Sequence, residues 1–288
     1  MSESRESSNP VMRGVVRNNQ PAGGYAGFGA GVAGAGQAAM TQQQMQYSQQ
    51  YPQAPAAMRS LTIDDVVQKT SITLGVLIAA AAASYAVIHQ NTALATPLML
   101  IGMIGGLVLV LVASFGRKQD NPAIVLGYAV LEGVFVGAIS FVFANWVVRD
   151  GVSAGTLIGQ AVLATFGVFG GMLIVYKTGA IRVTPRFTRM MFAAIIGVLV
   201  LAVGNVIIAL FSGGAGPLRD GGPLAIIFSL VCIGLAAFSF MLDFDQADRL
   251  IRAGAPAKAA WGVALGLTVT LVWLYIEILR LLSYFQSR

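Results

Sequence analysis

The sequence has little that could carry enzymatic or metal chemistry. Its 288 residues include one cysteine and one histidine. A single cysteine excludes a disulfide framework, and Cys232 lies inside an apolar run, so we expect neither a metal cluster nor a cofactor. The chain also lacks a P-loop and an HExxH zinc motif, and we expect no nucleophile elbow. We therefore predict that the protein is not an enzyme.

Charge is also scarce. Only 10% of the residues are charged, against roughly 25% in a soluble domain, whereas 56% are hydrophobic and the mean hydropathy is +0.74. At this length only a bilayer readily accommodates so much apolar surface, so the lipid bilayer is the expected partner. The net charge of +6 does not indicate nucleic acid binding, because the basic residues lie in short loops and not in one stripe.

Residues 1–60 lack the apolar periodicity of helices and strands. They are rich in Gly, Ala, Gln, Ser and Pro, as in PAGGYAGFGAGVAGAGQ, and cannot bury enough apolar surface to offset the entropy of ordering. We predict a disordered cytoplasmic tail, which is either a plain linker or a segment that binds a partner or associates weakly with itself. No cleaved signal peptide is expected, because the first thirty residues contain no apolar h-region.

Residues 61–288 form the predicted transmembrane domain. Thr62 and Asp65 have the spacing of a capping box and predict the start of its first helix. Seven apolar segments follow, most near the roughly 20 residues that a spanning helix needs. They are Ser71–Ile88, Leu94–Phe115, Ala123–Val147, Thr156–Tyr176, Met190–Phe211, Pro223–Leu242 and Ala260–Tyr284. The predicted fold class is an all-α integral membrane protein with seven transmembrane helices.

Lys and Arg residues are concentrated in every second loop. The N-terminal flank and the second, fourth and sixth connectors carry most of them, whereas the first connector has none. The third and fifth connectors have one each, Arg149 and Arg219. The positive-inside rule therefore predicts a cytoplasmic N-terminus and, after seven crossings, a C-terminus outside. We expect a multi-pass protein of the plasma (inner) membrane of a bacterium.

Charged groups within the apolar segments are the candidates for function, because intramembrane charge is costly and usually functional. Glu132 lies about ten residues into the third segment, or roughly 15 Å, near the bilayer midplane. It either lines an ion pathway or forms a buried pair, for example with Arg280 of the seventh segment. Asp243 and Asp245 end the sixth segment, and Glu277 lies inside the seventh. We predict that these acids bind or gate a cation.

Three motifs, taken in this order, resemble the transmembrane Bax inhibitor motif family. They are LEGVFVGAIS in the third segment, FMLDFDQ at the end of the sixth and LYIEILRLL in the seventh. The resemblance covers about residues 62–284, and the long tail and the TIDDVVQKT start look most like the bacterial, actinobacterial-type branch. It implies a seven-helix fold with a central last helix and a pH-sensitive calcium leak controlled by an acid pair in spans six and seven. By motif it assigns Asp245 and Glu277 to that pair, which would bind calcium, and Glu132 to the family's third-span glutamate.

Two features depart from the family pattern. The seventh-span acid is Glu277 and not an Asp, which changes the geometry of close carboxylates. The separation of Asp245 and Glu277 along the chain is also longer than usual. If Ala255 and Pro256 turn a simple hairpin, Glu277 lies roughly 18 Å further towards the outside than Asp245. On that geometry Glu277 would meet Glu132 more easily than Asp245.

These observations favour a pH-sensitive calcium or cation leak gated by intramembrane carboxylates. A proton shared by two close carboxylates would hold two helices together at low pH, and repulsion at higher pH would expose oxygen ligands for calcium. One alternative is a non-transporting regulatory protein that acts on a membrane protease or another membrane complex, with the acids as structural pairs. A proton-coupled transporter of small solutes is a third. An aspartyl intramembrane protease is disfavoured, because Glu277 lies in IEIL without the Gly-rich turn of such enzymes.

Overall fold

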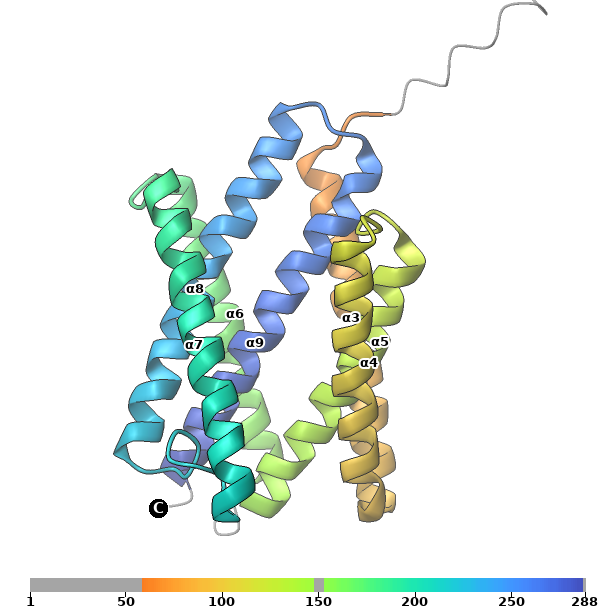
Figure 1. The fold of residues 1–288 in the computed structure, drawn as a ribbon. Helices are drawn as coiled ribbons and strands as arrows, with labels where there is room; N and C mark the ends of the chain where they lie inside the picture. The colour runs from red at the N-terminus through yellow and green to blue at the C-terminus, as the bar shows by residue number, and fades with distance from the viewer. Residues whose placement is uncertain (1–58, 148–152, 287–288) are drawn as a thin grey trace, which may run out of the picture. The chain divides into compact units, whose positions relative to one another are not determined.

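The computed structural model describes residues 59–147 and 153–286, so the predicted disordered tail lies outside the described residues. The described part contains seven helices that are long and apolar enough to cross a membrane (Figure 1). They are α3 (Ile63–Gln90), α4 (Ala95–Phe115), α5 (Pro122–Val142), α6 (Ala154–Thr178), α7 (Pro185–Ser212), α8 (Pro223–Arg252) and α9 (Ala260–Gln286). Short helical turns join them at η1 (Thr92–Leu94), η2 (Phe143–Val147) and η3 (Ala257–Ala259). The predicted fold class is confirmed.

Several helices extend beyond the predicted apolar segments. Helix α8 continues to Arg252, ten residues past Leu242, so that the aspartates after the sixth segment lie on the helix and not in a connector. Helix α3 begins at Ile63, where the predicted capping box forms: Asp65 N–H donates to Thr62 Oγ1 at 3.3 Å, and Thr62 N–H donates to Asp65 Oδ2 at 3.0 Å. Hydropathy locates only the part of a helix inside the bilayer, whereas backbone hydrogen bonding carries the helix on through polar residues.

Helix α9 is the central helix. Of its most apolar window, 72% is buried inside the protein, against 6% for α7. Helix α9 packs against α3, α5, α6 and α8, whereas α7 packs chiefly against α8. Figure 1 shows α9 running between the group α3–α4–α5 and the group α6–α7–α8. This arrangement agrees with the central last helix that the family resemblance implied.

Glycines allow α3, α4 and α5 to pack closely against one another. A Cβ atom on Gly133 or Gly137 of α5 would collide with the carbonyl oxygens of Leu77 and Ala81 of α3. A Cβ on Gly102 of α4 would lie only 2.6 Å from a backbone nitrogen of α5. Such close backbone approach is the usual basis of helix association in lipid, where burial of apolar side chains gives little driving force.

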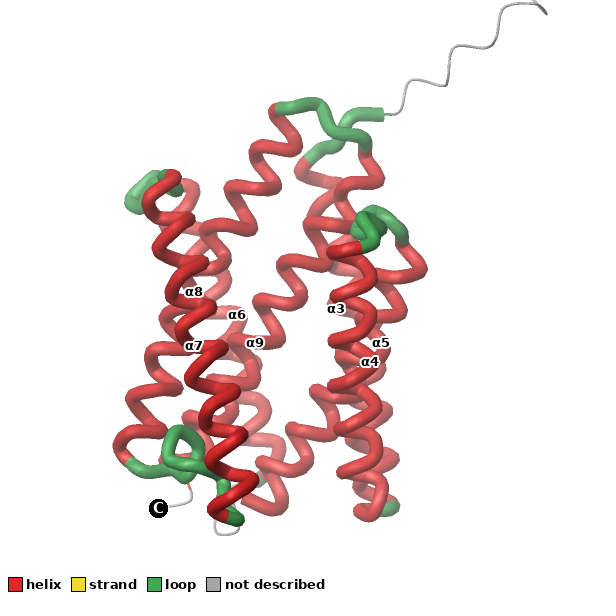
Figure 2. Tube along the Cα trace, in the orientation of Figure 1, coloured by secondary structure: helices red, strands yellow, loops and turns green. Residues whose placement is uncertain are grey.

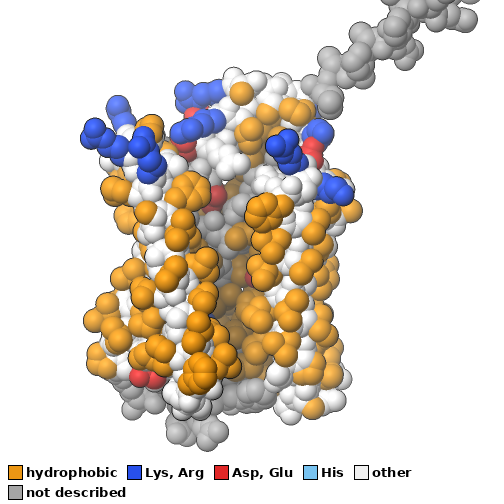
Figure 3. Space-filling view, in the orientation of Figure 1, with side chains coloured by type: hydrophobic (Ala, Val, Ile, Leu, Met, Phe, Trp, Pro, Cys, Tyr) orange, Lys and Arg blue, Asp and Glu red, His pale blue; other side chains and the backbone are white. Residues whose placement is uncertain are grey.

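The connectors lie at the two ends of the helices (Figure 2). At one end, the segment before α3 pairs with the α8–α9 connector, because Leu61 N–H donates to the carbonyl oxygen of Ala255 at 2.7 Å. Lys258 of the same connector forms a 2.6 Å ion pair with Asp120 between α4 and α5. Figure 3 shows the Lys and Arg side chains gathered at this end, as the alternating loop pattern predicts.

Candidate functional site

Asp243 lies where α8 packs against α9. Thr270 Oγ1 of α9 donates to Asp243 Oδ2 at 2.7 Å. Thr270 is buried and Asp243 is half-buried. A Cβ atom on Gly266 would lie 3.6 Å from Asp243 Oδ1, so the glycine lets the α9 backbone approach the carboxyl group. Among the described residues, no Lys, Arg or His forms an ion pair with Asp243.

The Thr270 hydroxyl has a second acceptor within reach. Its Oγ1 lies 3.2 Å from the carbonyl oxygen of Gly266, one helical turn earlier. A hydroxyl carries one proton and two lone pairs, so it donates to one acceptor at a time while it can also accept. Thr270 can therefore donate to an ionised Asp243, or accept from a protonated Asp243 while it donates to Gly266. The contact can be satisfied in both protonation states.

Asp245 and Asp248 have different surroundings from Asp243. Asp245 Oδ2 pairs with Arg249 at 2.6 Å, and Asp248 Oδ2 pairs with Arg252 at 2.9 Å, both at the i,i+4 spacing. Both aspartates line an open cavity of about 420 Å³ with Tyr176. The pairs lie near the cation-rich end of the molecule, where water screens them, and each is a local helix-surface ion pair.

Glu277 is the most enclosed acid in the spans. Its side chain is 5% exposed and accepts from two guanidinium groups. Arg219 of the α7–α8 connector binds it in a bidentate manner, with both N–O distances at 2.9 Å. Arg280, one turn further along α9, donates to Oε1 at 2.9 Å. Burial lowers the pKa of Arg219, but the hydrogen bond and the charge of Glu277 outweigh this effect and hold the pKa above its ordinary value. The cluster fixes the connector to α9.

Glu132 lies on α5 against α4. Its Oε2 atom occupies the space beside Gly106, where a Cβ atom would lie 2.5 Å away. The carboxyl group is half-buried. The described residues form no ion pair with Glu132, and Arg280 pairs with Glu277 instead. The buried pair of Glu132 with Arg280, one of the two predicted alternatives, therefore does not form.

A mainly apolar cavity in the described part of the chain contains no acid. It has a volume of about 450 Å³ and lies between α3, α5, α6 and α9. Its walls are mainly apolar, and the hydrogen-bonded hydroxyls of Ser140 and Tyr275, 2.8 Å apart, stand among its polar groups. The acids that the sequence singled out lie elsewhere, so this cavity is not the candidate cation site.

Comparison with known families places these features in context. The family model described as Bax inhibitor 1 like matches residues 29–287. The chain belongs to the Bax inhibitor 1 like family. No curated protein matches the sequence. The match extends over all seven helices, and the narrower assignment to an actinobacterial-type branch stays a prediction.

In this Bax inhibitor 1 like chain, Asp245 and Glu277 do not meet. Thr270 stands level with Asp243, Glu277 lies seven residues beyond Thr270, and Asp245 lies two residues beyond Asp243 in the opposite direction. The two carboxylates are therefore roughly 14 Å apart along the helix axes. The structure does not bring together the two predicted calcium ligands, and the described residues contain no cluster of three or more acidic, His or Cys side chains that could hold a metal ion. The positions of the two acids agree with their long separation along the chain, and not with the contact that the family motif implies.

Sequence reasoning missed two residues of these sites. Thr270 was overlooked because an uncharged hydroxyl in an apolar span is common. Counting residues away from the turn at residues 253–256 along both helices nevertheless places Thr270 close to Asp243. Arg219 entered the sequence prediction only as one of the loop charges that indicate the orientation of the chain in the membrane. Its signal was a lone arginine in a connector that otherwise carries one charged residue, Asp220.

One sequence pattern has a structural explanation. Residues 151–155 read GVSAG, the spacing of a nucleophile elbow. Ser153 instead caps α6: its Oγ accepts from the backbone N–H of Thr156 at 3.2 Å. A nucleophile elbow requires a strand that turns into a helix, and no strand precedes this serine in the described part of the chain.

Proposed function

We propose that this protein is a pH-sensitive leak for calcium or a similar cation, in which Asp243 and its contact with Thr270 form the gate. The observation that carries the proposal is a carboxyl group at the α8–α9 contact whose hydrogen-bond partner is a hydroxyl and not a cation. An ionised carboxylate at this depth attracts a cation, because the surrounding protein and lipid supply little other compensation. Family membership gives independent support.

Protonation would close the gate. A neutral Asp243 can donate to Thr270, and this uncharged contact lets α8 and α9 stay together in a low dielectric. Loss of the proton leaves a charge that favours water and a hard divalent cation, for which carboxylate and hydroxyl oxygens are suitable ligands. We therefore expect flux to rise with pH.

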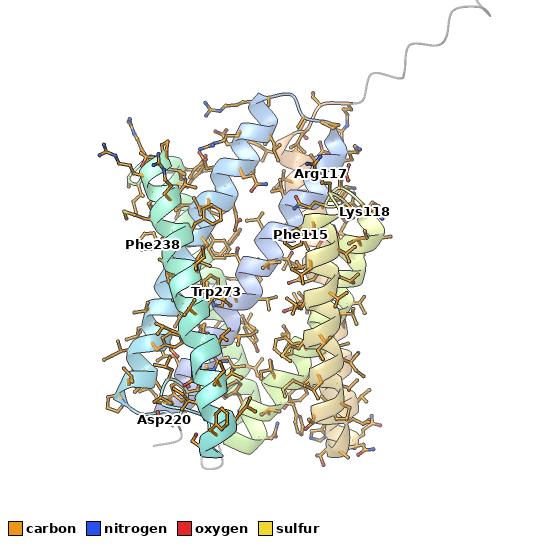
Figure 4. All side chains as sticks on the ribbon, in the orientation of Figure 1. Phe115, Arg117, Lys118, Asp220, Phe238 and Trp273 are labelled. Carbon is orange, nitrogen blue, oxygen red and sulfur yellow. The ribbon has the colours of Figure 1, made fainter. Side chains whose placement is uncertain are left out.

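A passage for the ion has structural support on one face. Figure 3 shows this face hollowed between α4 and α7. Trp273 of α9 lies in the same region, between the two helix groups (Figure 4). Helix α7 packs chiefly against α8, so movement of α7 would disturb few other helices. Glu132, which has no ion-pair partner among the described residues, is a second acid for a passing cation.

The proposal includes the setting of the protein. The cation-rich end would face the cytoplasm of a bacterial cell and the helices would cross its plasma membrane, in agreement with the positive-inside rule. Lipid and the permeant cation are then the partners, and no cofactor is required.

Purified protein in liposomes with a trapped calcium dye tests this function. We expect wild-type flux to rise as the pH is raised, because loss of the proton from Asp243 opens the proposed gate. Asp243→Asn mimics the protonated carboxyl and should hold flux at the low-pH level throughout. Asp248→Asn removes a half-buried aspartate that pairs with Arg252, and should behave as the wild type. An unchanged pH response in Asp243→Asn would remove Asp243 from the gate.

A non-transporting regulator is the second candidate. It is favoured by the ion pairs of Glu277, Asp245 and Asp248, which make these acids structural. If the wild-type protein passes neither calcium nor a monovalent cation in the liposome assay, this candidate replaces the leak. Capture of a membrane protease or another membrane complex by the full chain would then be the next measurement.

A further inference from the structure

The hairpin of α6 and α7 carries a cluster of uncompensated positive charge. From Ala154 to Ser212 it contains no Asp or Glu and four basic residues. These are Lys177, Arg182, Arg186 and Arg189, which we call the hairpin cations. All four are exposed, and they gather where the two helices join (Figure 3). In the described part of the chain, none of them forms an ion pair.

Four other cations at this end have acidic partners. Arg249 pairs with Asp245, Lys258 pairs with Asp120, and Arg59 pairs with Asp65. Arg252 likewise pairs with Asp248. Asp245 and Asp248 line the same cavity as Lys177 and Arg182, but each of these aspartates is already paired with an arginine of α8.

The start of α7 is an unfavourable position for cations. The helix begins at Pro185 after the N-cap residue Thr184, so Arg186 and Arg189 lie in its first two turns. The positive end of the helix dipole disfavours a cation there. An external anion would reverse this effect, because it would interact favourably with both the guanidinium groups and the dipole.

The surroundings of the cluster fit a lipid better than a soluble anion. Lys177 and Arg182 line the open cavity of about 420 Å³ described above. Large apolar side chains are exposed directly beside the cations: Met190 is 67% exposed and Phe192 is 59% exposed. A layer of cations above an apolar girdle matches a phospholipid, whose charged headgroup and hydrocarbon chains lie at these two levels.

We propose that the hairpin cations bind the phosphate of an anionic phospholipid, with the headgroup at the cavity mouth and the chains against α7. The site would anchor α7, the helix with the least protein contact. It uses none of the residues of the gate, so it stands or falls independently of the cation leak.

Native mass spectrometry of the full-length protein in detergent tests the site by titration with phosphatidylglycerol or phosphatidylcholine. We expect the wild type to bind one phosphatidylglycerol at least about tenfold more tightly than phosphatidylcholine. Changing all four hairpin cations to Gln should reduce this preference to near unity. Changing Arg182, Arg186 and Arg189 to Lys keeps the charge and should keep the preference. Unchanged binding of phosphatidylcholine by the Gln variant would show that its loss of preference is not a failure to fold.

A matched control uses the α4–α5 connector. Arg117 and Lys118 lie at the same end and, among the described residues, also have no acidic partner (Figure 4). The Arg117→Gln, Lys118→Gln double variant should keep the lipid preference. Equal wild-type affinity for the two lipids, or an equal loss in this control, would overturn the proposal. So would displacement of the lipid by glycerol phosphate at a similar concentration, which would indicate a site for soluble anions.

Discussion

Asp243 and Glu277 are both carboxylates within membrane-spanning helices, but their neighbours differ. Glu277 accepts from the guanidinium groups of Arg219 and Arg280, whereas Asp243 accepts from the hydroxyl of Thr270. Fixed cations neutralise the first charge permanently. Among the described residues, no cation pairs with the charge of Asp243. Depth in the bilayer therefore does not by itself identify a functional acid, and the groups that face the carboxylate decide its role.

The largest expected effect is loss of Glu277. Glu277→Gln leaves two guanidinium groups close together without their shared anion, and breaking a buried pair in this way costs about 3–5 kcal/mol. The free energy of unfolding in detergent should fall by about 3 kcal/mol or more. Asp243→Asn, which strands no cation, is the matched control and should lose about 1 kcal/mol or less. Equal losses in the two variants would contradict the comparison.

A middle-sized effect is expected at the hydroxyl. Thr270→Val keeps the shape of the side chain but removes the donor to Asp243, which should cost about 1–2 kcal/mol of unfolding free energy. If the leak operates as proposed, the midpoint of calcium flux should also move to higher pH, because Thr270 binds the ionised carboxylate more strongly than the neutral carboxyl group. Thr268→Val is the control, since Thr268 is buried on the same helix but donates only to the Ala264 carbonyl oxygen. A flux midpoint that moves equally in both variants would rule out a specific role for Thr270.

The smallest effect is expected for an acid outside the spans. The hydrogen bond from Lys258 is the main cause that lowers the pKa of Asp120 in the folded state. The pair therefore stabilises the folded state at pH values above the unfolded pKa of about 4. Its contribution is lost as the pH falls below that value and the carboxyl group is protonated. Because the side chains of Lys258 and Asp120 are 54% and 36% exposed and water screens the pair, the contribution should be only about 0.2–1 kcal/mol. Lys258→Gln should lower the unfolding free energy by this amount at pH 7 and not at pH 3. A larger loss at pH 3 than at pH 7 would show that the ion pair is not its cause.

Much of the fold could be predicted from the sequence. The seven apolar segments gave the seven helices, and Thr62 and Asp65 gave the first helix start. The boundaries were less accurate, because α8 carries its aspartates on a helix that continues past the apolar segment. Hydropathy reports the medium around a residue, and it does not report where backbone hydrogen bonding stops.

The acids themselves could be found from the sequence, but their partners could not. The family motif suggested that Asp245 meets Glu277, whereas the residue count from the turn suggested otherwise, and the count agrees with the structure. The partner of Asp243 is a threonine that no charge pattern singles out. Of the two partners of Glu277, Arg219 comes from a connector 58 residues earlier in the chain.

The sequence by itself determined that this chain crosses a membrane seven times and that a few acids lie within the crossings, because hydrophobic burial and intramembrane charge depend on residue type and local order. Only the tertiary structure decided that Glu277 is bound by two arginines while Asp243 faces a hydroxyl. Such contacts depend on helix rotation, on the level at which two helices pass each other and on how a connector folds back. These are set by packing over the whole bundle and leave little trace in the neighbouring residues of the chain.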